Sequence, residues 1–239
     1  MRLYIVGFGP GDEKTMTMAA RDAIIDSDLV VGYTTYVKLV QEIFPEKKYV
    51  STGMRQERDR VDYAIRQAAE GHRVSLICSG DSGVYGMAGL ALSMAGEQKD
   101  VEIVVIPGVT AALSGGARLG APLTHDFCVI SLSDLLTPWE KIEKRLVYGA
   151  MGDFTMAIYN PSSVKRADYL KRECDILLQY KSKDTICGYV KNIGRKEEQS
   201  EILTLGELRN TKVDMFTTVF IGNSETQVIA GRMVTPRGY

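Results

Sequence analysis

The sequence predicts an α/β protein with two lobes, each built from a mixed or parallel sheet that helices flank. Short apolar runs rich in β-branched residues alternate along the chain with longer amphipathic stretches, which is the pattern of alternating strands and helices. Gly and Pro interrupt this alternation in the segment 119–123, after which it starts again. We therefore expect one lobe at 1–119 and a second lobe at 120–239.

In the first lobe, each apolar strand is followed by a helical stretch. Strands are expected at 3–9, 28–33, 73–80 and 101–108, and helices at 16–27, 58–70, 85–95 and 110–119. Parallel strands need such crossover helices, so a parallel sheet is the natural packing. In the second lobe we expect strands at 128–134, 154–160, 185–192 and 215–223, and helices at 139–148 and 163–180.

The amino-acid composition of the chain excludes several kinds of binding partner. The 239 residues carry a formal net charge of -1 and no dense run of Lys and Arg, which argues against nucleic acid. The 4 cysteines are scattered without a CxxC pair and there are 2 histidines, so neither a protein-bound metal nor a disulfide framework is expected. No leader pattern or long apolar span is visible, so we expect a complete, cytoplasmic chain without a membrane partner. A small molecule is the expected partner.

Three strand ends of the first lobe are rich in glycine. They are GFGPGD at 7–12, SGDSGVYG at 79–86 and PGVTAA at 107–112. Ligands of open parallel sheets bind outside the carboxyl ends of the strands, so these turns are placed to line one crevice. Each turn alone is also explained as a tight turn or helix start, with Gly for conformation and Asp or Thr as a cap. The three turns together favour a ligand site.

The turns do not fit a phosphate ligand. The dinucleotide fingerprint needs a third Gly at position 12, where this chain has Asp12. A phosphate-binding loop needs Gly-Lys-Ser/Thr, whereas Gly11 is followed by two acidic residues. The backbone groups and the side chains of Asp81, Ser82 and Thr110 instead suit a neutral or cationic polar ligand.

In this order, GFGPGD, GDSGVYG and PGVTAA resemble the tetrapyrrole methylase family, and the resemblance covers the whole chain. Members of that family bind S-adenosylmethionine between two α/β lobes, so the resemblance implies this methyl donor, a tetrapyrrole substrate and a homodimer. A sulfonium cation also fits turns that lack a phosphate-binding Lys. The cofactor-binding residues that the resemblance implies are Pro10, Ser79, Gly80, Asp81, Val84, Thr110 and Ala111, with Asn160 and Ile193 in the second lobe.

Further segments resemble one branch of the family. They are VGYTTY at 31–36, STGMRQE at 51–57, HDF at 125–127, SLSDLLTPW at 131–139 and RMVTPRGY at 232–239. Enzymes of this branch methylate a corrin precursor at C-17 and contract the macrocycle during cobalamin biosynthesis. The resemblance thus implies precorrin-3B or cobalt-factor III as the substrate, and precorrin-4 or cobalt-precorrin-4 as the product. Whether the substrate already contains cobalt stays open.

The implied chemistry makes positioning the main task of the protein. Methyl transfer from a sulfonium is an in-line displacement, so the ring carbon has to be held against the methyl group in a water-poor cleft. Ring contraction also needs a group that moves protons while a substrate carboxylate closes a lactone. The candidates are the polar residues Tyr33, Arg55, His125, Asp126 and Ser131, with Asn192 and Arg195 as further candidates near the wall of the second lobe.

Several of these residues have an ordinary structural explanation. Tyr33 is equally well a core residue with a satisfied hydroxyl. A structural role is favoured for His125, because it and its acidic neighbour would point to opposite faces of a strand. Arg55, Arg58, Arg60 and Arg195 are candidates to bind acidic groups of the substrate by bidentate pairing. A solvated face explains Arg58 and Arg60 at least as well, so only Arg55 is kept as a site residue.

Other functions stay open. A methylase of the same fold that acts at another corrin carbon or on a diphthamide precursor would share these turns. So would a non-catalytic protein that holds a tetrapyrrole or a nucleoside in the same cleft. Tyr33 and Met54 stand where related uroporphyrinogen methylases carry Asp and Lys, so the acid–base assignment of those enzymes does not transfer to this chain.

Overall fold

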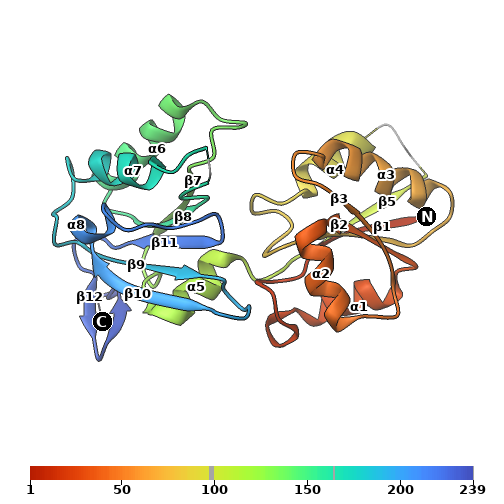
Figure 1. Ribbon diagram of the computed structural model, residues 1–239, viewed down its shortest axis with the longest axis horizontal. Helices are drawn as coiled ribbons and strands as arrows, with labels where there is room; N and C mark the ends of the chain where they lie inside the picture. The colour runs from red at the N-terminus through yellow and green to blue at the C-terminus, as the bar shows by residue number, and fades with distance from the viewer. Residues whose placement is uncertain (97–99, 164, 239) are drawn as a thin grey trace. The chain divides into compact units, whose positions relative to one another are not determined.

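The computed structural model describes residues 1–96, 100–163 and 165–238, and it divides into two compact units, Met1–Thr110 and Ala111–Tyr239. Each unit contains one five-stranded sheet with helices on its faces (Figure 1). The expected class, two α/β lobes with parallel or mixed sheets, is confirmed. The division falls between Thr110 and Ala111, ahead of the helix α5 (Ala111–Leu119), whereas the sequence placed it in the segment 119–123.

The sheet of the first unit is parallel throughout, as the sequence predicts. Its strand order is β3-β2-β4-β1-β5, and every pair of neighbouring strands runs in the same direction. Its strands are β1 (Arg2–Gly7), β2 (Leu29–Tyr33), β3 (Lys48–Thr52), β4 (Val74–Cys78) and β5 (Glu102–Ile106), and its helices are α1 (Met18–Asp26), α2 (Thr34–Ile43), α3 (Glu57–Ala69), α4 (Ala88–Ala95) and the 3-10 turn η1 (Glu13–Thr15).

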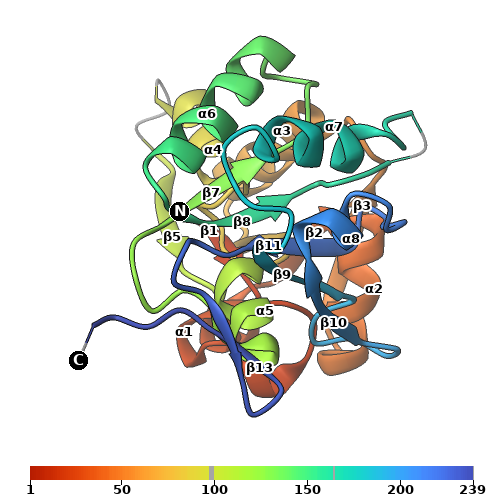
Figure 2. The same ribbon diagram turned by 90° about the vertical axis from the view of Figure 1, so that its left-hand side faces the viewer.

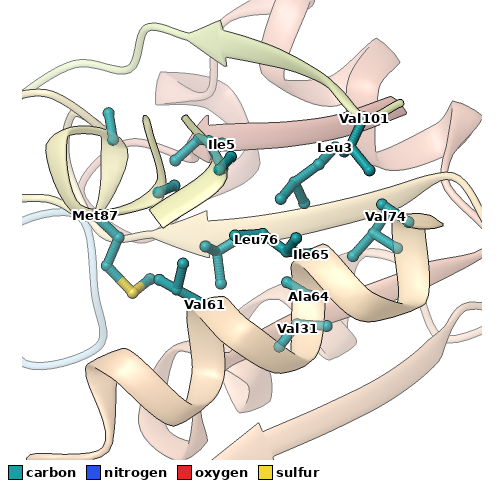
Figure 3. Close-up of a cluster of buried hydrophobic side chains, with 14 of the residues drawn as sticks. Leu3, Ile5, Val31, Val61, Ala64, Ile65, Val74, Leu76, Met87 and Val101 are labelled. Carbon is teal, nitrogen blue, oxygen red and sulfur yellow. The ribbon is translucent and has the colours of Figure 1, made fainter. Parts of the chain in front are cut away.

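Helices cover both faces of this sheet because successive residues of a strand point to opposite faces. Leu3 and Ile5 of β1 belong to the apolar cluster beneath α3 and α4, where Figure 3 shows them beside Leu76 and the helix residue Val61. Tyr4 and its neighbour Val6 belong to the opposite cluster, under α1 and α2. Burial of each large apolar side chain contributes about 1.5–3 kcal/mol, so both clusters hold the carboxyl edge of the sheet in place.

Two elements of this unit were not predicted from the sequence, α2 and β3. The segment of α2 is rich in the β-branched residues Thr and Val, which are weak helix formers, and it is a helix because Val37 and Val40 are buried against the sheet. The helix expected from Tyr85 begins later, at Ala88, because Tyr85 has a positive φ of 54° and lies in a turn. Packing and turn geometry therefore decide these boundaries.

The second unit has a mixed sheet of order β10-β9-β11-β8-β7. Its strands are β7 (Phe127–Ser131), β8 (Thr155–Tyr159), β9 (Ile186–Lys191), β10 (Gln199–Thr204) and β11 (Thr217–Ile221). β7 and β8 pair in parallel, and β11 is antiparallel to both β8 and β9. The strands β7, β8 and β9 therefore point the same way, and their carboxyl ends lie along one edge of the sheet.

Helices α6 (Trp139–Met151), α7 (Tyr169–Leu177) and α8 (Leu205–Leu208) pack with one apolar cluster of this sheet, and α5 packs with the other (Figure 2). The helix expected at 163–180 is shorter at both ends, since α7 spans Tyr169–Leu177. Val164, which falls within the expected range, lies outside the described residues. None of the helices in the described ranges combines the length and apolar character that a bilayer-crossing segment requires.

The segment that the sequence treats as a joint belongs to a small third sheet of the second unit. Its order is β12-β13-β6, formed by β6 (Gly120–Ala121), β12 (Gln227–Ile229) and β13 (Arg232–Val234). The hydroxyl of Thr235 donates to the carbonyl of Pro122 at 2.8 Å, and the Thr235 N–H donates to the carbonyl of Ala121 at 3.1 Å. These pairings attach the segment after α5 to the C-terminal hairpin.

Candidate functional site

The glycine turns of the first unit meet at the carboxyl edge of its sheet. Gly9 and Gly80 exchange two backbone hydrogen bonds, of 3.0 and 2.8 Å. A Cβ atom on Gly108 would lie 2.1 Å from the carbonyl oxygen of Gly80, and one on Gly7 would lie 2.8 Å from the backbone nitrogen of Gly108. Any side chain at these positions would push the turns apart. Glycine is therefore needed here for close approach of backbones.

Asp81 ties two of these turns together. Its Oδ1 accepts hydrogen bonds from the backbone N–H groups of Gly83 and Val84 at 2.8 and 3.0 Å, and its Oδ2 accepts one from Gly108 at 2.9 Å. The hydroxyl of Ser82 adds a bond to the carbonyl of Ile106 at 2.9 Å. Bonds to an ionised acceptor are roughly twice as strong as neutral ones, so Asp81 positions the backbone that the resemblance assigns to cofactor binding.

The other residues of these turns differ in burial. Pro10 is buried, and Ser79 and Val84 are half-buried beside the paired turns. The carboxylate of Asp12 accepts a hydrogen bond from the backbone nitrogen of Thr15 at 2.8 Å and caps the short η1 turn. The Asp12 carboxylate is therefore engaged by Thr15. The glycine turn before it presents backbone groups, and no charged side chain, to a ligand.

Tyr33 ends β2, and Arg55 follows the neighbouring strand β3 at the same edge. Tyr33 is half-buried, and its ring meets the ring of Tyr36 edge-on with 5.2 Å between centroids. Arg55 has a positive φ of 67°, its side chain is exposed, and its N–H donates to Oε1 of Glu57 at 3.3 Å. The first unit thus brings the glycine turns, Tyr33 and Arg55 to one edge, where parallel sheets bind ligands.

Arg60 also belongs to this edge, and of the two explanations that the sequence left open for it, the solvated face is wrong. Its side chain is buried, with 3% of the residue exposed. It donates from Nε to the hydroxyl of Thr52 at 2.7 Å and from the guanidinium to the carbonyl of Gly53 at 2.8 Å, and burial lowers its pKa. The available signal is helical spacing, because Arg60 lies four residues before the buried Ala64 on the apolar stripe of α3.

In the second unit, Ser131 and Asn160 come together. They end the neighbouring parallel strands β7 and β8, and the side-chain amide of Asn160 donates to the hydroxyl of Ser131 at 2.9 Å. Ser131 Oγ also accepts from the N–H of Ser133 at 3.2 Å. Asn160 has a positive φ of 54°, a conformation that Asn tolerates better than most residues. The pair fixes the direction of the chain after β7.

Asn192 and Ile193 follow β9 at the same edge. Asn192 also has a positive φ of 54°, and its N–H donates to the carbonyl of Phe216 at 3.1 Å. The side chain of Ile193 is buried and packs on α5, where a Cβ on Gly115 would lie 3.0 Å from it. The Arg195 guanidinium lies 5.5 Å from the ring centroid of Phe216. Ile193 therefore offers a ligand its backbone rather than its side chain.

The start of α5 is linked to this edge by Tyr159. The N–H of Ala112 donates to the Tyr159 hydroxyl at 2.7 Å, and Tyr159 directly precedes Asn160. Helix starts leave several N–H groups without a partner in the helix, and this bond satisfies one of them. Ala111 packs beside Ala112 in the cluster that includes Ile193. Thr110, the last residue of the first unit, directly precedes this helix start.

The structure does not bring His125 and Asp126 to the edge that carries Ser131. Both precede β7, whose five residues span about 13 Å, so they lie at its opposite end. They lie in a bend rather than on a strand, with side chains 43% and 82% exposed. His125 Nδ1 accepts the Asp126 N–H at 2.8 Å and lies 3.6 Å from Oδ2 of Asp126, so its contacts are with its own neighbour.

Within the described part of the chain, no three His, Cys, Asp or Glu side chains are grouped as a metal ion would require. The residues able to hold a cofactor are those of the paired turns, whose backbone amides and carbonyls are close together and whose sequence contains no Lys, Arg or His. Such a donor set fits a polar, non-phosphate group.

Together, the fold and these turns define a two-unit α/β protein with paired glycine turns at the carboxyl ends of the strands of its parallel sheet. Residues 2–209 match the family of tetrapyrrole (corrin/porphyrin) methylases, and the chain belongs to that family. The chain is 49% identical over 238 residues to a probable cobalt-factor III C(17)-methyltransferase of Salmonella typhimurium, with 99% of each chain covered. It is 37% identical to a precorrin-3B C(17)-methyltransferase of Sinorhizobium sp, covering 99% of this chain and 96% of that one.

Solved structures agree with this family. The crystal structure of the methyltransferase CobJ is 37% identical, with a TM-score of 0.90 and coverage of 98% of this chain and 99% of that one. A uroporphyrin-III C-methyl transferase from Thermus thermophilus, complexed with S-adenyl homocysteine, shares the fold at 22% identity and a TM-score of 0.69, with 93% and 97% covered.

Proposed function

We propose that this chain is an S-adenosylmethionine-dependent methyltransferase that methylates a corrin precursor at C-17 and contracts its ring. The observation that carries the proposal is the 49% identity, over nearly the whole of both chains, with a cobalt-factor III C(17)-methyltransferase. The identity with a precorrin-3B C(17)-methyltransferase is lower, 37%. Cobalt-factor III is therefore the proposed substrate, and cobalt-precorrin-4 the proposed product.

The glycine turns are the proposed cofactor site in the first unit. Pro10, Ser79, Gly80 and Val84 would contact S-adenosylmethionine mainly through backbone groups, and Asp81 would hold the turns in register through its three amide bonds. When bound, the cofactor supplies an electrophilic methyl group on a sulfonium. Turns with a carboxylate and without a basic side chain suit such a cation.

Further cofactor contacts through backbone groups are proposed at Thr110, which ends the first unit, and in the second unit at Ala111, Asn160 and Ile193. The positive φ angles of Asn160 and Asn192 turn the chain sharply after β8 and β9. Ile193 would contribute its N–H and carbonyl, because its side chain is committed to the core. Rigid backbone groups of this kind hold a methyl donor in line with its acceptor, which is the main source of rate in such a displacement.

Three polar side chains are proposed to act on the substrate. The exposed Arg55 guanidinium would pair with a substrate carboxylate, for which its planar fork is suited. The hydroxyls of Tyr33 and Ser131 would hold or pass a proton during ring contraction, since each ends a strand of its own unit's sheet, β2 or β7, and strand ends are where ligands of such sheets bind. His125 and Asp126 are supported least by the geometry, because they lie at the other end of β7.

Two measurements test the proposal. Calorimetry should detect binding of S-adenosylmethionine and of S-adenosylhomocysteine, and the absence of both would refute the cofactor. Incubation with cobalt-factor III and methyl-labelled cofactor under anaerobic conditions should place label on the macrocycle. The mass and absorption spectrum of the product then separate methylation alone from methylation with contraction. The homodimer that the resemblance implies would be refuted by a monomer mass in light scattering.

A further inference from the structure

Arg60 differs from other cationic residues of the first unit because it is buried and has only neutral hydrogen-bond partners. They are the hydroxyl of Thr52 at 2.7 Å, the carbonyl of Gly53 at 2.8 Å and the sulfur of Met87 at 3.5 Å. Among the described residues, no acidic side chain forms an ion pair with it. Buried charges in proteins are ordinarily paired, so this charge lacks the partner that its burial calls for.

The guanidinium lies beneath the carboxyl ends of three adjacent strands. Thr52 ends β3, Met87 precedes α4 after the end of β4, and the ring of Tyr33, which ends β2, has its centroid 5.9 Å from the guanidinium carbon. The groups that act electrostatically on Arg60 are Glu57, Cys78, Tyr36 and Tyr33. Burial raises the pKa of the Cys78 thiol to about 11, so it is neutral near pH 7. Glu57 is exposed, where water screens its charge.

We propose that Arg60 is a positioning residue whose buried charge, acting beneath Tyr33, selects a substrate with acidic side chains. This inference rests on the proposed function, since it takes the acidic macrocycle as the ligand. The charge is fixed in place by the bonds to Thr52 and Gly53 rather than carried on a mobile surface side chain. An anion that binds over Tyr33 would face an oriented cation that is largely shielded from water.

The size of the effect follows from distance. One phenol ring beyond the guanidinium, whose carbon lies 5.9 Å from the ring centroid, places a substrate carboxylate about 9 Å from the charge, and at an effective dielectric of about 20 this changes a binding constant about 20-fold. An exposed arginine at the same distance is screened by water and salt and has a smaller effect. Arg58, which is exposed on the same helix, is the matched comparison because its removal changes the net charge equally.

The test uses two forms of one ligand, cobalt-factor III with free carboxylates and cobalt-factor III with those groups esterified. Binding of each is titrated by absorbance to the full chain carrying Arg60→Met, Arg60→Lys or Arg58→Met. Arg60→Met should weaken the acid about 10- to 30-fold and leave the ester unchanged. Arg58→Met should change neither ligand by more than about 2-fold. Arg60→Lys keeps the charge and should keep most of the preference for the acid.

Arg60→Met overturns the proposal if it weakens acid and ester equally, because Arg60 would then only support the end of β3. A loss of preference in Arg60→Lys as large as in Arg60→Met overturns it in the same way. If Arg60→Met does not fold, the test uses Arg60→Lys alone. This variant should keep the preference for the acid over the ester, and the preference should decline as salt is added; loss of the preference overturns the proposal. Binding of S-adenosylhomocysteine and methyl transfer by the unmodified chain are measured beside these titrations, so failure of the proposed reaction is seen separately from failure of the charge effect.

Discussion

Replacing Glu173 by Gln should make the protein markedly more stable in alkaline solution. Glu173 lies on α7 with 0% of its surface exposed, and neither of its carboxyl oxygens has a hydrogen-bond partner among the described residues. Burial alone raises its pKa from the ordinary value of 4.5 to about 8, since no cation compensates the charge. The change Glu173→Gln keeps the shape of the side chain and removes the charge.

The magnitude follows from the shift. Between pH 4.5 and about 8 the folded chain holds a proton on Glu173 that the unfolded chain has released, so unfolding becomes easier as the pH rises. Each pH unit in this window costs about 1.4 kcal/mol, which sums to at most about 5 kcal/mol above pH 8. Below pH 4.5 the carboxyl group is neutral in both states, and its titration has no effect.

Urea unfolding followed by circular dichroism between pH 5 and pH 9 measures this difference. Near pH 5 the variant and the unmodified chain should agree within about 1 kcal/mol, because both side chains are neutral and equally short of partners. Near pH 9 the variant should be more stable by several kcal/mol. Glu143→Gln, an exposed change of equal charge on α6, is the control. Parallel stability curves for Glu173→Gln and the unmodified chain would refute the reasoning.

Three further outcomes follow from the site. Gly108→Ala places a methyl group 2.1 Å from a carbonyl oxygen and should lower the unfolding temperature and abolish calorimetric binding of S-adenosylhomocysteine, whereas Gly89→Ala, with no atom within 4 Å, should do neither. A double-mutant cycle of Ser131→Ala and Asn160→Ala should give a coupling of about 0.5–1.5 kcal/mol in urea unfolding, and additive effects would contradict their hydrogen bond. His125→Ala should change kcat/KM less than about 2-fold, and a loss of more than about 100-fold would restore it as a catalytic group.

The fold was predictable where local pattern and packing agree. Strands followed by helices gave the parallel first sheet because crossover connections leave few other arrangements. The antiparallel pairs of the second sheet were not predictable, because β10 reads QSEILT, with polar residues over its first half, and lacks the apolar run of a central strand. The place of α5 in the second unit depends on a contact between Gly115 and Phe220, residues far apart in the sequence.

The candidate site, like the fold, was predictable from the sequence only in part. The meeting of the glycine turns was predictable because strand ends of a parallel sheet share an edge. Arg60 was left out of the candidate site because a charged residue beside acidic neighbours is ordinarily solvated, and only its position on the apolar stripe of α3 indicates burial. His125 was expected on a strand, but it lies in the bend ahead of β7, where its ring accepts the next N–H. Such bends are decided by local hydrogen bonds rather than by periodicity.

Two opposite charges lie at different places along the carboxyl edge of the first sheet. Asp81 follows β4 and bonds to Gly108 beyond β5, so its carboxylate lies on the β4-β1-β5 side, among the glycine turns. Arg60 lies under the ends of β3, β2 and β4 on the other side. Strands spaced about 4.8 Å apart keep these charges on different halves of the edge. If the proposed function and the proposed role of Arg60 hold, a cationic methyl donor is favoured at the turns and an acidic macrocycle over Tyr33, and one sheet edge distinguishes the two reactants by charge.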